Sequence, residues 1–240
     1  MIIGINGYAG SGKDTVGTII QYLQADTNIP LKGVLKKTPH HIWWLEERSG
    51  WEIKKWAGKL KEVASLLTGI PVENFEDQEF KTTLLGPEWG TVTFNPLNAI
   101  PVFSDIQFNH LISVREFLQR LGTDAIRDGL HTNAWVNALM AGYTKTVSDC
   151  GTSKKGTSVK CSKHPNWIIT DTRFPNEAEA IKKAGGIVIR VDRPGVKPIN
   201  DHPSETGLDK WDFDYKIANV SDVKSLSLSV QMILEKENIL

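Results

Sequence analysis

The sequence predicts an α/β protein in which a parallel sheet is covered by helices on both faces. Apolar runs of strand length recur along the chain, and helical patterns follow several of them. The first run, residues 2–6, leads directly into a glycine-rich turn and then into a helical pattern. Strands that alternate with helices form parallel sheets, and such strands are apolar throughout because both of their faces are buried.

The remaining elements of this sheet come late in the chain. The helix after Lys13 ends before Pro30, and strands are then predicted at 167–170, 187–191 and 215–218. Helices are predicted at 177–184 and 223–234. The resulting order is strand, helix, insertion, strand, helix, strand, loop, strand and helix, which gives a three-layer sandwich.

The part between the first two strands is less regular. Residues 31–50 show no clear period, and a helix is predicted from about residue 51 to residue 67. Residues 71–110 predict mostly loops, with one strand of a hairpin at 91–94. A helical region follows at 113–145 and opens with Ser113 and Glu116 in the spacing of a capping box.

Residues 148–166 are rich in Ser, Gly, Thr and Lys. This composition predicts an exposed hairpin or a mobile loop.

Composition excludes several classes of protein. The 28 basic and 28 acidic residues give a formal net charge of zero, which argues against a general nucleic-acid binder. Two cysteines are too few for a disulfide scaffold. The longest apolar runs have the length of strands, and the N-terminus lacks the pattern of a signal peptide. We therefore expect a soluble cytoplasmic protein with no membrane partner.

The turn after the first strand carries a phosphate-binding pattern. Residues 7–13 match G-x-x-x-x-G-K, with a buried strand before and a helix after, which is the context of a P-loop. The backbone N–H groups and the positive end of the helix surround phosphates, and Lys13 reaches the β- and γ-phosphates. The alternative is a chance glycine-rich turn. The predicted ATP-binding residues of the loop are Gly10, Ser11, Gly12, Lys13, Asp14 and Thr15.

One position departs from the usual P-loop pattern. Asp14 follows Lys13, where a Ser or Thr that binds Mg²⁺ is usual, and Thr15 comes next. In one interpretation Asp14 contacts Mg²⁺, directly or through water, while Thr15 bonds a phosphate oxygen. In the other, Asp14 is a carboxylate favoured by the helix dipole. The sequence leaves both open.

A second candidate cluster follows the strand at 167–170. Ligands bind beyond the carboxyl ends of the strands in open parallel sheets. Asp171 is placed there to hold Mg²⁺ or its water, and Arg173 to clamp the transferring oxygens. The alternative for Arg173 is a surface ion pair with Glu177 or Glu179.

A third strand end brings Arg193, a further predicted ATP ligand, to the same edge. The long loop that follows is predicted to act as a lid, because loops of this length in compact domains are usually functional. His202 lies within this loop. It is either a catalytic residue or, as we prefer, a hydrogen-bonded structural histidine.

The insertion carries candidate residues for binding the acceptor of the phosphoryl group. Lys61, Lys81 and Arg115 are cations for an acceptor phosphate. Gln119, Asp124 and Trp135 offer a stacking surface and partners for the edges of a base. Residues of these types are more often packing or surface residues.

Several motifs together resemble one family. They are Gly12-Lys13-Asp14-Thr15, Trp56-Ala57-Gly58-Lys59-Leu60-Lys61, Ser113-Val114-Arg115, Leu121-Gly122-Thr123-Asp124, Trp135-Val136, Asp171-Thr172-Arg173 with Glu177, Arg193-Pro194-Gly195 and Asp201-His202-Pro203-Ser204-Glu205. In this order they closely resemble the bacteriophage deoxynucleoside monophosphate kinases, over roughly residues 1–20, 51–85 and 110–235.

This resemblance implies transfer of a phosphoryl group from ATP, with Mg²⁺, to a deoxynucleoside 5′-monophosphate. The implied architecture is adenylate-kinase-like: a core (about 1–30, 111–193 and 215–240), an acceptor-binding insertion (31–110) and a lid-like loop (194–214) in one domain. If the source is viral, the location is the host cytoplasm. A homodimer is compatible with the sequence, which does not give the oligomeric state.

The resemblance also implies roles for individual residues. Lys13 and its loop bind ATP, while Lys61 and Arg115 look like ligands of the acceptor phosphate. Acceptor-pocket roles carry over to Gln119, Thr123, Asp124 and Trp135. The residues that look like the cluster at the reacting phosphates are Asp171, Arg173 and Glu177.

Three rival hypotheses remain at this point. One is a kinase of the same fold that acts on another small metabolite, such as a coenzyme A precursor or a sugar acid. Another is a P-loop ATPase without an acceptor. The third adds a zinc site at Cys150, Cys161 and His164, although three ligands are fewer than the four of a usual structural site.

Overall fold

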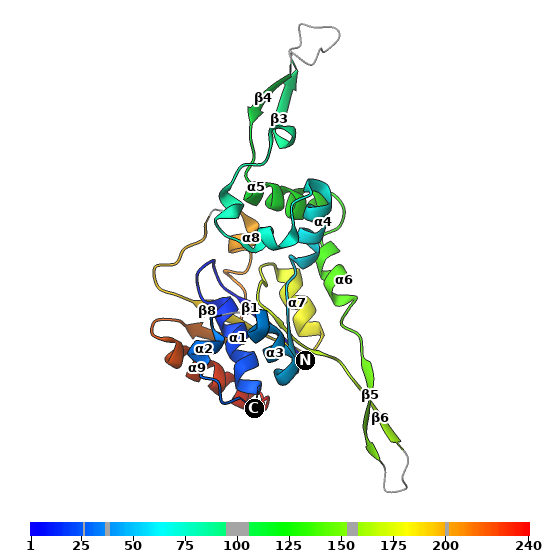
Figure 1. The fold of residues 1–240 in the computed structure, drawn as a ribbon, viewed down its shortest axis with the longest axis vertical. Coiled ribbons are helices and arrows are strands. Elements are labelled where there is room, and N and C mark those ends of the chain that lie inside the picture. Colours follow the sequence, from blue (N-terminus) through cyan, green and yellow to red (C-terminus); the bar gives the residue numbers. More distant parts are fainter. Residues whose placement is uncertain (26, 37–38, 95–105, 153–157, 200–201) are drawn as a thin grey trace. The chain divides into compact units, whose positions relative to one another are not determined.

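The computed structural model describes residues 1–25, 27–36, 39–94, 106–152, 158–199 and 202–240. Figure 1 shows the path of the chain. The chain forms two compact units, one from Met1–Trp56 with Val136–Leu240 and the other from Ala57–Trp135. The division into core, insertion and lid-like loop stays a prediction. In the described part of the chain, no helix has both the length and the apolar character needed to cross a bilayer.

The first unit is built on a five-stranded sheet with the order β2-β7-β1-β8-β9. All four neighbouring pairs are parallel. The strands are β1 (Ile2–Asn6), β2 (Trp51–Lys54), β7 (Asn166–Ile169), β8 (Ile187–Asp192) and β9 (Tyr215–Ala218). The predicted parallel α/β sheet is therefore confirmed.

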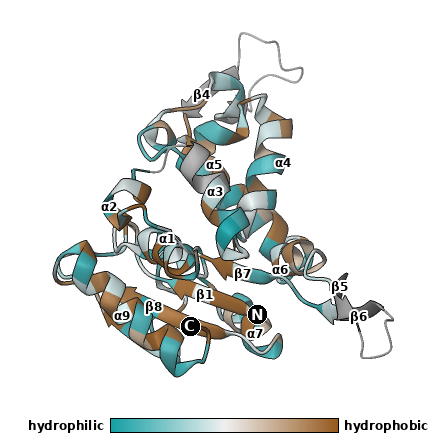
Figure 2. Ribbon diagram, turned by 60° about the horizontal axis from the view of Figure 1, so that its bottom comes forward, coloured by the Kyte–Doolittle hydropathy of each residue, from teal (hydrophilic) through white to brown (hydrophobic). Residues whose placement is uncertain are grey.

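Helices cover both faces of this sheet, and the alternation of side chains along β1 determines what each face contacts. Ile3 and Ile5 pack in the core that includes α1 (Lys13–Gln24) and α9 (Val223–Lys236). Ile2, on the opposite face, packs in the core that includes α7 (Pro175–Lys183). Figure 2 shows β1 and β8 as mostly hydrophobic, as strands buried on both faces should be.

Strand β2 corrects one prediction. The single helix expected from residue 51 to residue 67 is wrong at its start, because Trp51–Lys54 is an edge strand parallel to β7. Helix α4 begins only at Gly58 and ends at Thr68. The four residues of β2 alternate between apolar and polar, and this period of two was lost beside the longer helical pattern. Gln21 of α1 fastens the strand by donating from Nε2 to the Trp51 carbonyl oxygen at 2.7 Å.

The other elements of the first unit lie between or after these strands. Residues 31–50, which showed no period, form α2 (Leu31–Val34) and α3 (Pro39–Ser49). Of the two alternatives for residues 148–166, the hairpin is confirmed, because β5 (Thr146–Thr152) and β6 (Ser158–Lys163) pair antiparallel. Helix α8 (Pro203–Thr206) lies in the loop between β8 and β9, and α6 (Ala134–Met140) begins in the second unit and ends in the first.

The second unit is mostly helical. It contains α4, η1 (Val72–Glu76), η2 (Phe80–Thr82), η3 (Pro87–Trp89), β3 (Thr91–Phe94), β4 (Ile106–His110), α5 (Val114–Gln119) and the π-helix η5 (Arg120–Asp128). The antiparallel pair β3–β4 confirms the predicted hairpin. The predicted cap of α5 is present too, since the Ser113 hydroxyl accepts from the Glu116 N–H at 3.1 Å.

Phe75 is the fully buried aromatic residue at the centre of the second unit's core. We expect Phe75→Ala to lower the free energy of unfolding by about 3–5 kcal/mol, because it removes buried apolar area and leaves a cavity. Urea unfolding checks this. Leu66→Ala, at a leucine that is 86% exposed, is the control and should change stability by less than about 0.5 kcal/mol. Similar losses in the two variants would contradict the assigned core.

Candidate active site

The glycine-rich turn links β1 to the start of α1. Gly10 and Gly12 have φ angles of 83° and 99°, in a region that side chains other than glycine rarely adopt. The turn is closed by a hydrogen bond from the Ser11 N–H to the Tyr8 carbonyl oxygen at 3.1 Å, and the first helical bond runs from Val16 to Gly12 at 2.9 Å. The loop thus directs the free N–H groups of a helix start at one point, which is a geometry that binds phosphate.

Asn219, which the sequence did not single out, braces this loop from the other end of the chain. Its Nδ2 donates to the Ser11 carbonyl oxygen at 2.8 Å, and its own N–H donates to the Asp192 carbonyl oxygen at 2.7 Å. A methyl group on Gly12 would lie 2.6 Å from the same Nδ2 atom. The only signal in the sequence was that Asn219 directly follows a short strand.

Asp14 connects the loop to the end of strand β7. One carboxylate oxygen accepts from Lys13 Nζ at 2.9 Å, and the other accepts from the buried Thr170 hydroxyl at 3.0 Å. Burial by itself raises the pKa of Asp14. The charge and hydrogen bond of Lys13, the charge of Lys55 and the Thr170 hydroxyl outweigh burial and lower that pKa to about 2. Asp14 is therefore ionised at neutral pH.

This low pKa predicts a pH dependence of stability. A carboxyl group whose pKa is lower in the folded protein stabilises the fold above its unfolded pKa, and the stabilisation is lost as the pH falls through the folded value. We expect the stability difference between the protein and Asp14→Asn to shrink from the ordinary value of 3.8 down to about pH 2. Urea unfolding of both proteins across this range measures it. A constant difference would contradict the assigned pKa.

The residues after β7 are fixed by hydrogen bonds. Asp171 accepts from the Trp56 backbone N–H at 2.8 Å, and the buried Thr172 hydroxyl accepts from the Trp56 indole N–H at 3.3 Å. Asn6, at the end of β1, donates to the Thr172 carbonyl oxygen at 2.7 Å. Asp171 therefore anchors the chain that leaves β2, and its role toward Mg²⁺ stays a prediction.

Arg173 is held at both its backbone and its side chain. Glu177, which is 1% exposed, accepts the Arg173 N–H at 2.7 Å and the Phe174 N–H at 3.1 Å, and so caps α7. The Arg173 guanidinium pairs with Glu205 at 3.0 Å, instead of with Glu177 or Glu179. The structure thus gives Glu177 a role in holding the backbone, and its predicted role toward the acceptor stays a prediction.

Two further arginines lie near the loop. Arg193 donates to the Gly10 carbonyl oxygen at 3.4 Å from an exposed position. Arg190, which the sequence analysis did not select, is buried and donates to Asn6 at 2.6 Å and Asp192 at 2.7 Å. Its guanidinium also lies 4.5 Å from the centre of the Tyr8 ring, so Arg190 packs against the loop through a cation–π contact.

His202 takes a structural position. Its Nδ1 accepts from the Ser204 N–H at 3.1 Å and lies 2.8 Å from the Ser204 hydroxyl, at the start of α8. This arrangement agrees with the preferred interpretation of His202 as a hydrogen-bonded structural residue.

The predicted acceptor cations belong to the second unit. Lys61 is buried and bonds Glu76, while Arg115 donates to the Gln78 side-chain oxygen at 3.2 Å. Both cations therefore face the segment just before η2, which itself carries Lys81. The structure thus brings Lys61 and Arg115 to one short segment, and their roles toward an acceptor phosphate stay predictions.

The residues predicted for the acceptor base differ in their surroundings. The Trp135 indole is 7% exposed and donates to the Gly122 carbonyl oxygen at 2.9 Å, so it packs inside the unit. Gln119 ends α5, and Thr123 and Asp124 lie in η5. The π-helix was not predicted; such turns are rare and often occur at functional sites.

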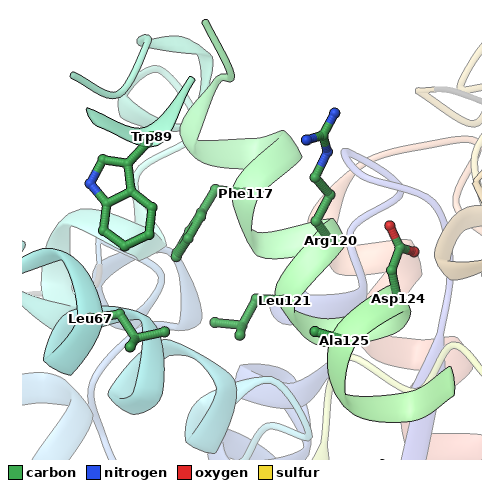
Figure 3. Close-up of a pocket in the computed structure, with 7 residues that line it drawn as sticks. All are labelled: Leu67, Trp89, Phe117, Arg120, Leu121, Asp124 and Ala125. Atoms are coloured by element: carbon green, nitrogen blue, oxygen red, sulfur yellow. The ribbon is translucent and has the colours of Figure 1, made fainter. Parts of the chain in front are cut away.

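Asp124 also lines a cavity of about 750 Å³. Its lining is Leu67, Trp89, Phe117, Arg120, Leu121, Asp124 and Ala125. Figure 3 shows the Trp89 and Phe117 rings on one side and the charged groups of Arg120 and Asp124 on the other. The two rings meet edge to face, with centres 4.9 Å apart.

The zinc hypothesis stays untested. The side chains of Cys150 and Cys161 lie outside the described residues, while His164 stacks on Tyr143 with ring centres 4.6 Å apart. Within the described residues, no three His, Cys, Asp or Glu side chains gather as metal ligands would.

A parallel sheet with a P-loop after β1, and arginines at the ends of the two strands that flank β1, is the arrangement of a P-loop phosphotransferase. Comparison with known proteins identifies the family. The model of the deoxynucleotide monophosphate kinase family matches residues 73–230, and the chain belongs to this family. It is therefore a kinase, and the hypotheses of a different metabolite kinase and of an ATPase without an acceptor are set aside.

Two of the relatives are similar over nearly the whole chain, and a third over a part of it. The deoxynucleoside-5'-monophosphate kinase of Escherichia phage T5 is 26% identical over 99% of this chain and 97% of its own length. The deoxynucleotide monophosphate kinase of Enterobacteria phage T4 is 25% identical over 98% of each chain. A putative deoxynucleotide monophosphate kinase of Acanthamoeba polyphaga mimivirus is 35% identical over 39% of this chain and 46% of its own.

Proposed function

We propose that this kinase transfers the γ-phosphoryl group of ATP to the phosphate of a deoxynucleoside 5′-monophosphate, giving the diphosphate and ADP. The observation that carries the proposal is the group of Lys13, Asp14 and Thr170, which joins the phosphate-binding loop to the end of β7. The similarity to deoxynucleotide monophosphate kinases over the whole chain supports it.

On the donor side, this chain's residues bind and neutralise phosphate oxygens. Lys13 leaves Asp14 in part to contact the β- and γ-phosphates, and the N–H groups of Gly10 and Gly12 bind the same oxygens. Arg173 and Arg193 neutralise charge that spreads over the transferred group. The acceptor phosphate, whose second pKa is about 6, is already largely ionised, so no general base is required.

The donor set also fits Mg²⁺. Asp14 and Asp171 would supply carboxylate oxygens, which Mg²⁺ prefers as ligands, while Thr15 would bond a phosphate oxygen. Asp14 is ionised, as a ligand must be, because its pKa is about 2. These residues would hold the ion, and it would supply positive charge that offsets the charge of the phosphates. One or two carboxylates, completed by phosphate and water, suffice for such a site.

On the acceptor side, Lys61, Lys81 and Arg115 bind the phosphate of the monophosphate. Glu76 and Gln78 hold two of these cations before the acceptor arrives, which lowers the entropy lost on binding. The proposed pocket for the base and sugar comprises Gln119, Thr123, Asp124 and Trp135, with Glu177 near the reacting phosphates.

The test is a substrate panel. The purified protein is incubated with ATP, Mg²⁺ and each of dGMP, dTMP, dCMP, dAMP and their ribonucleotide counterparts, and nucleotide products are separated. We expect ADP and a deoxynucleoside diphosphate to form in equal amounts with at least one deoxynucleotide. ATP hydrolysis that no monophosphate changes would overturn the proposal.

A further inference from the structure

The guanidinium of Arg173 is held along one edge. Its Nη1 donates to the Glu205 carboxylate at 3.0 Å and to the Ser204 carbonyl oxygen at 3.5 Å. No hydrogen bond from Nε or Nη2 occurs within the described part of the chain. A guanidinium carries five N–H groups in a rigid fork. The contact with Glu205 therefore fixes the fork and leaves its other donors for oxygen ligands.

The Arg173 guanidinium and the Glu205 carboxylate differ in exposure. This difference indicates which of the two is fixed by the protein around it. The Glu205 side chain is 7% exposed and that of Arg173 is 39% exposed. A carboxylate this buried requires a charged or hydrogen-bonded partner. Glu205 is thus the fixed member of the pair, and Arg173 presents its remaining donors to solvent.

The segment that carries Glu205 is itself anchored to the first unit. Leu208 is 1% exposed and packs in the core that includes α7. Asp209 accepts from the Tyr8 hydroxyl at 2.7 Å. Gly207 lies so close to Arg173 that a methyl group on it would be 2.9 Å from the Arg173 carbonyl oxygen. These contacts tie the segment that carries Glu205 to the first unit and to the residues that follow β7.

We propose that Glu205 is a positioning residue, which orients the guanidinium of Arg173 toward the transferred phosphoryl group. This inference rests on the function proposed above. Arg173 already has its backbone N–H bound by Glu177, so its side-chain torsions are the freedom that remains. Glu205 removes that freedom before the substrates bind, and the chemical step then needs less reorganisation.

The test is a double-mutant cycle on kcat. Glu205→Gln keeps the shape of the side chain and removes its charge, and we expect it to lower kcat about tenfold with little change in KM for either substrate. In the Arg173→Ala background, which itself loses about 10³-fold, the same change should have almost no further effect. Asp212→Asn, at an exposed position of the same loop, is the matched control and should leave kcat unchanged.

Each other outcome overturns the inference. Unchanged kcat in a folded Glu205→Gln variant would make the ion pair merely structural. Increased kcat would mean that Glu205 restrains Arg173, and an equal loss in both backgrounds would mean that Glu205 acts without Arg173. If Glu205→Gln does not fold, Glu205→Asp, which keeps the buried charge, takes its place in the cycle with the same expected result. Failure of the proposed function is a separate result, because it would appear as no transfer by the unmodified protein.

Discussion

Lys13→Ala is expected to lower kcat for phosphoryl transfer by at least about 10³-fold, because positioning and charge neutralisation account for most of the catalysis in this chemistry. Lys13 lies in the first turn of α1, with its ammonium group 2.9 Å from Asp14. No other cation in the described residues bonds Asp14. The change therefore removes both the contact to phosphate and the main positive charge beside this carboxylate.

The measurement is a coupled assay for ADP, with circular dichroism to show that the variant is folded. Lys32→Ala, at an exposed lysine of α2, is the matched control and should keep kcat within about twofold, since surface substitutions of this kind are nearly neutral. The pKa of Asp14 should also rise from about 2 in the Lys13 variant. Activity near that of the unmodified protein would refute the role assigned to the loop.

Gly12→Ala should abolish ATP binding while most of the sheet remains intact. The added methyl group meets two obstacles. The φ angle of 99° is unfavourable for alanine, by about 1–2 kcal/mol. In addition, the methyl group would lie 2.6 Å from Asn219 Nδ2, whose hydrogen bond to the Ser11 carbonyl oxygen must then break. Rotation of the Asn219 side chain relieves the contact but removes this brace from the loop, and any movement of the loop itself displaces the N–H groups that are proposed to bind phosphate.

Gly69→Ala separates these two effects. Gly69 has a similar φ angle of 72°, at the end of α4, but a methyl group there meets no atom within 4 Å. The Gly69→Ala variant should therefore lose only the stability that the backbone strain costs, and it should bind ATP normally. Isothermal titration with ATP compares the two variants. Equal affinities in Gly12→Ala and Gly69→Ala would show that the contact with Asn219 is unimportant.

The elements that form the phosphate site could be predicted because their signals are local. The run at 2–6, the seven-residue loop pattern and the apolar strand before Asp171 each lie within a few residues of one another. Strand β2 escaped prediction, since four residues beside a long helical pattern carry little periodic signal. The π-helix η5 was missed as well, because its register differs from that of an α-helix without any distinctive composition.

The contacts that orient the site residues could not be predicted from the sequence. Asn219 and Ser11 are 208 positions apart, and Arg173 and Glu205 are 32 apart, yet each pair is joined by a hydrogen bond. The order of elements assigns the strand ends to one edge of the sheet. Which side chains then bond one another depends on the register of the strands and on the rotamers of the side chains. On the acceptor side, the sequence selected Lys61 and Arg115 as cations, without the Glu76 and Gln78 partners that hold them.

The central place of β1 in the sheet has a consequence for how the protein is made. Its partners β7 and β8 begin at Asn166 and Ile187, so β1 leaves the ribosome long before either of the strands with which it pairs. Pairing across such separations is slow, and an unpaired apolar strand is prone to aggregate in the meantime. Because Asn219 completes the loop and comes still later in the chain, the nascent chain cannot gain a fully braced nucleotide site until Asn219 has been synthesised.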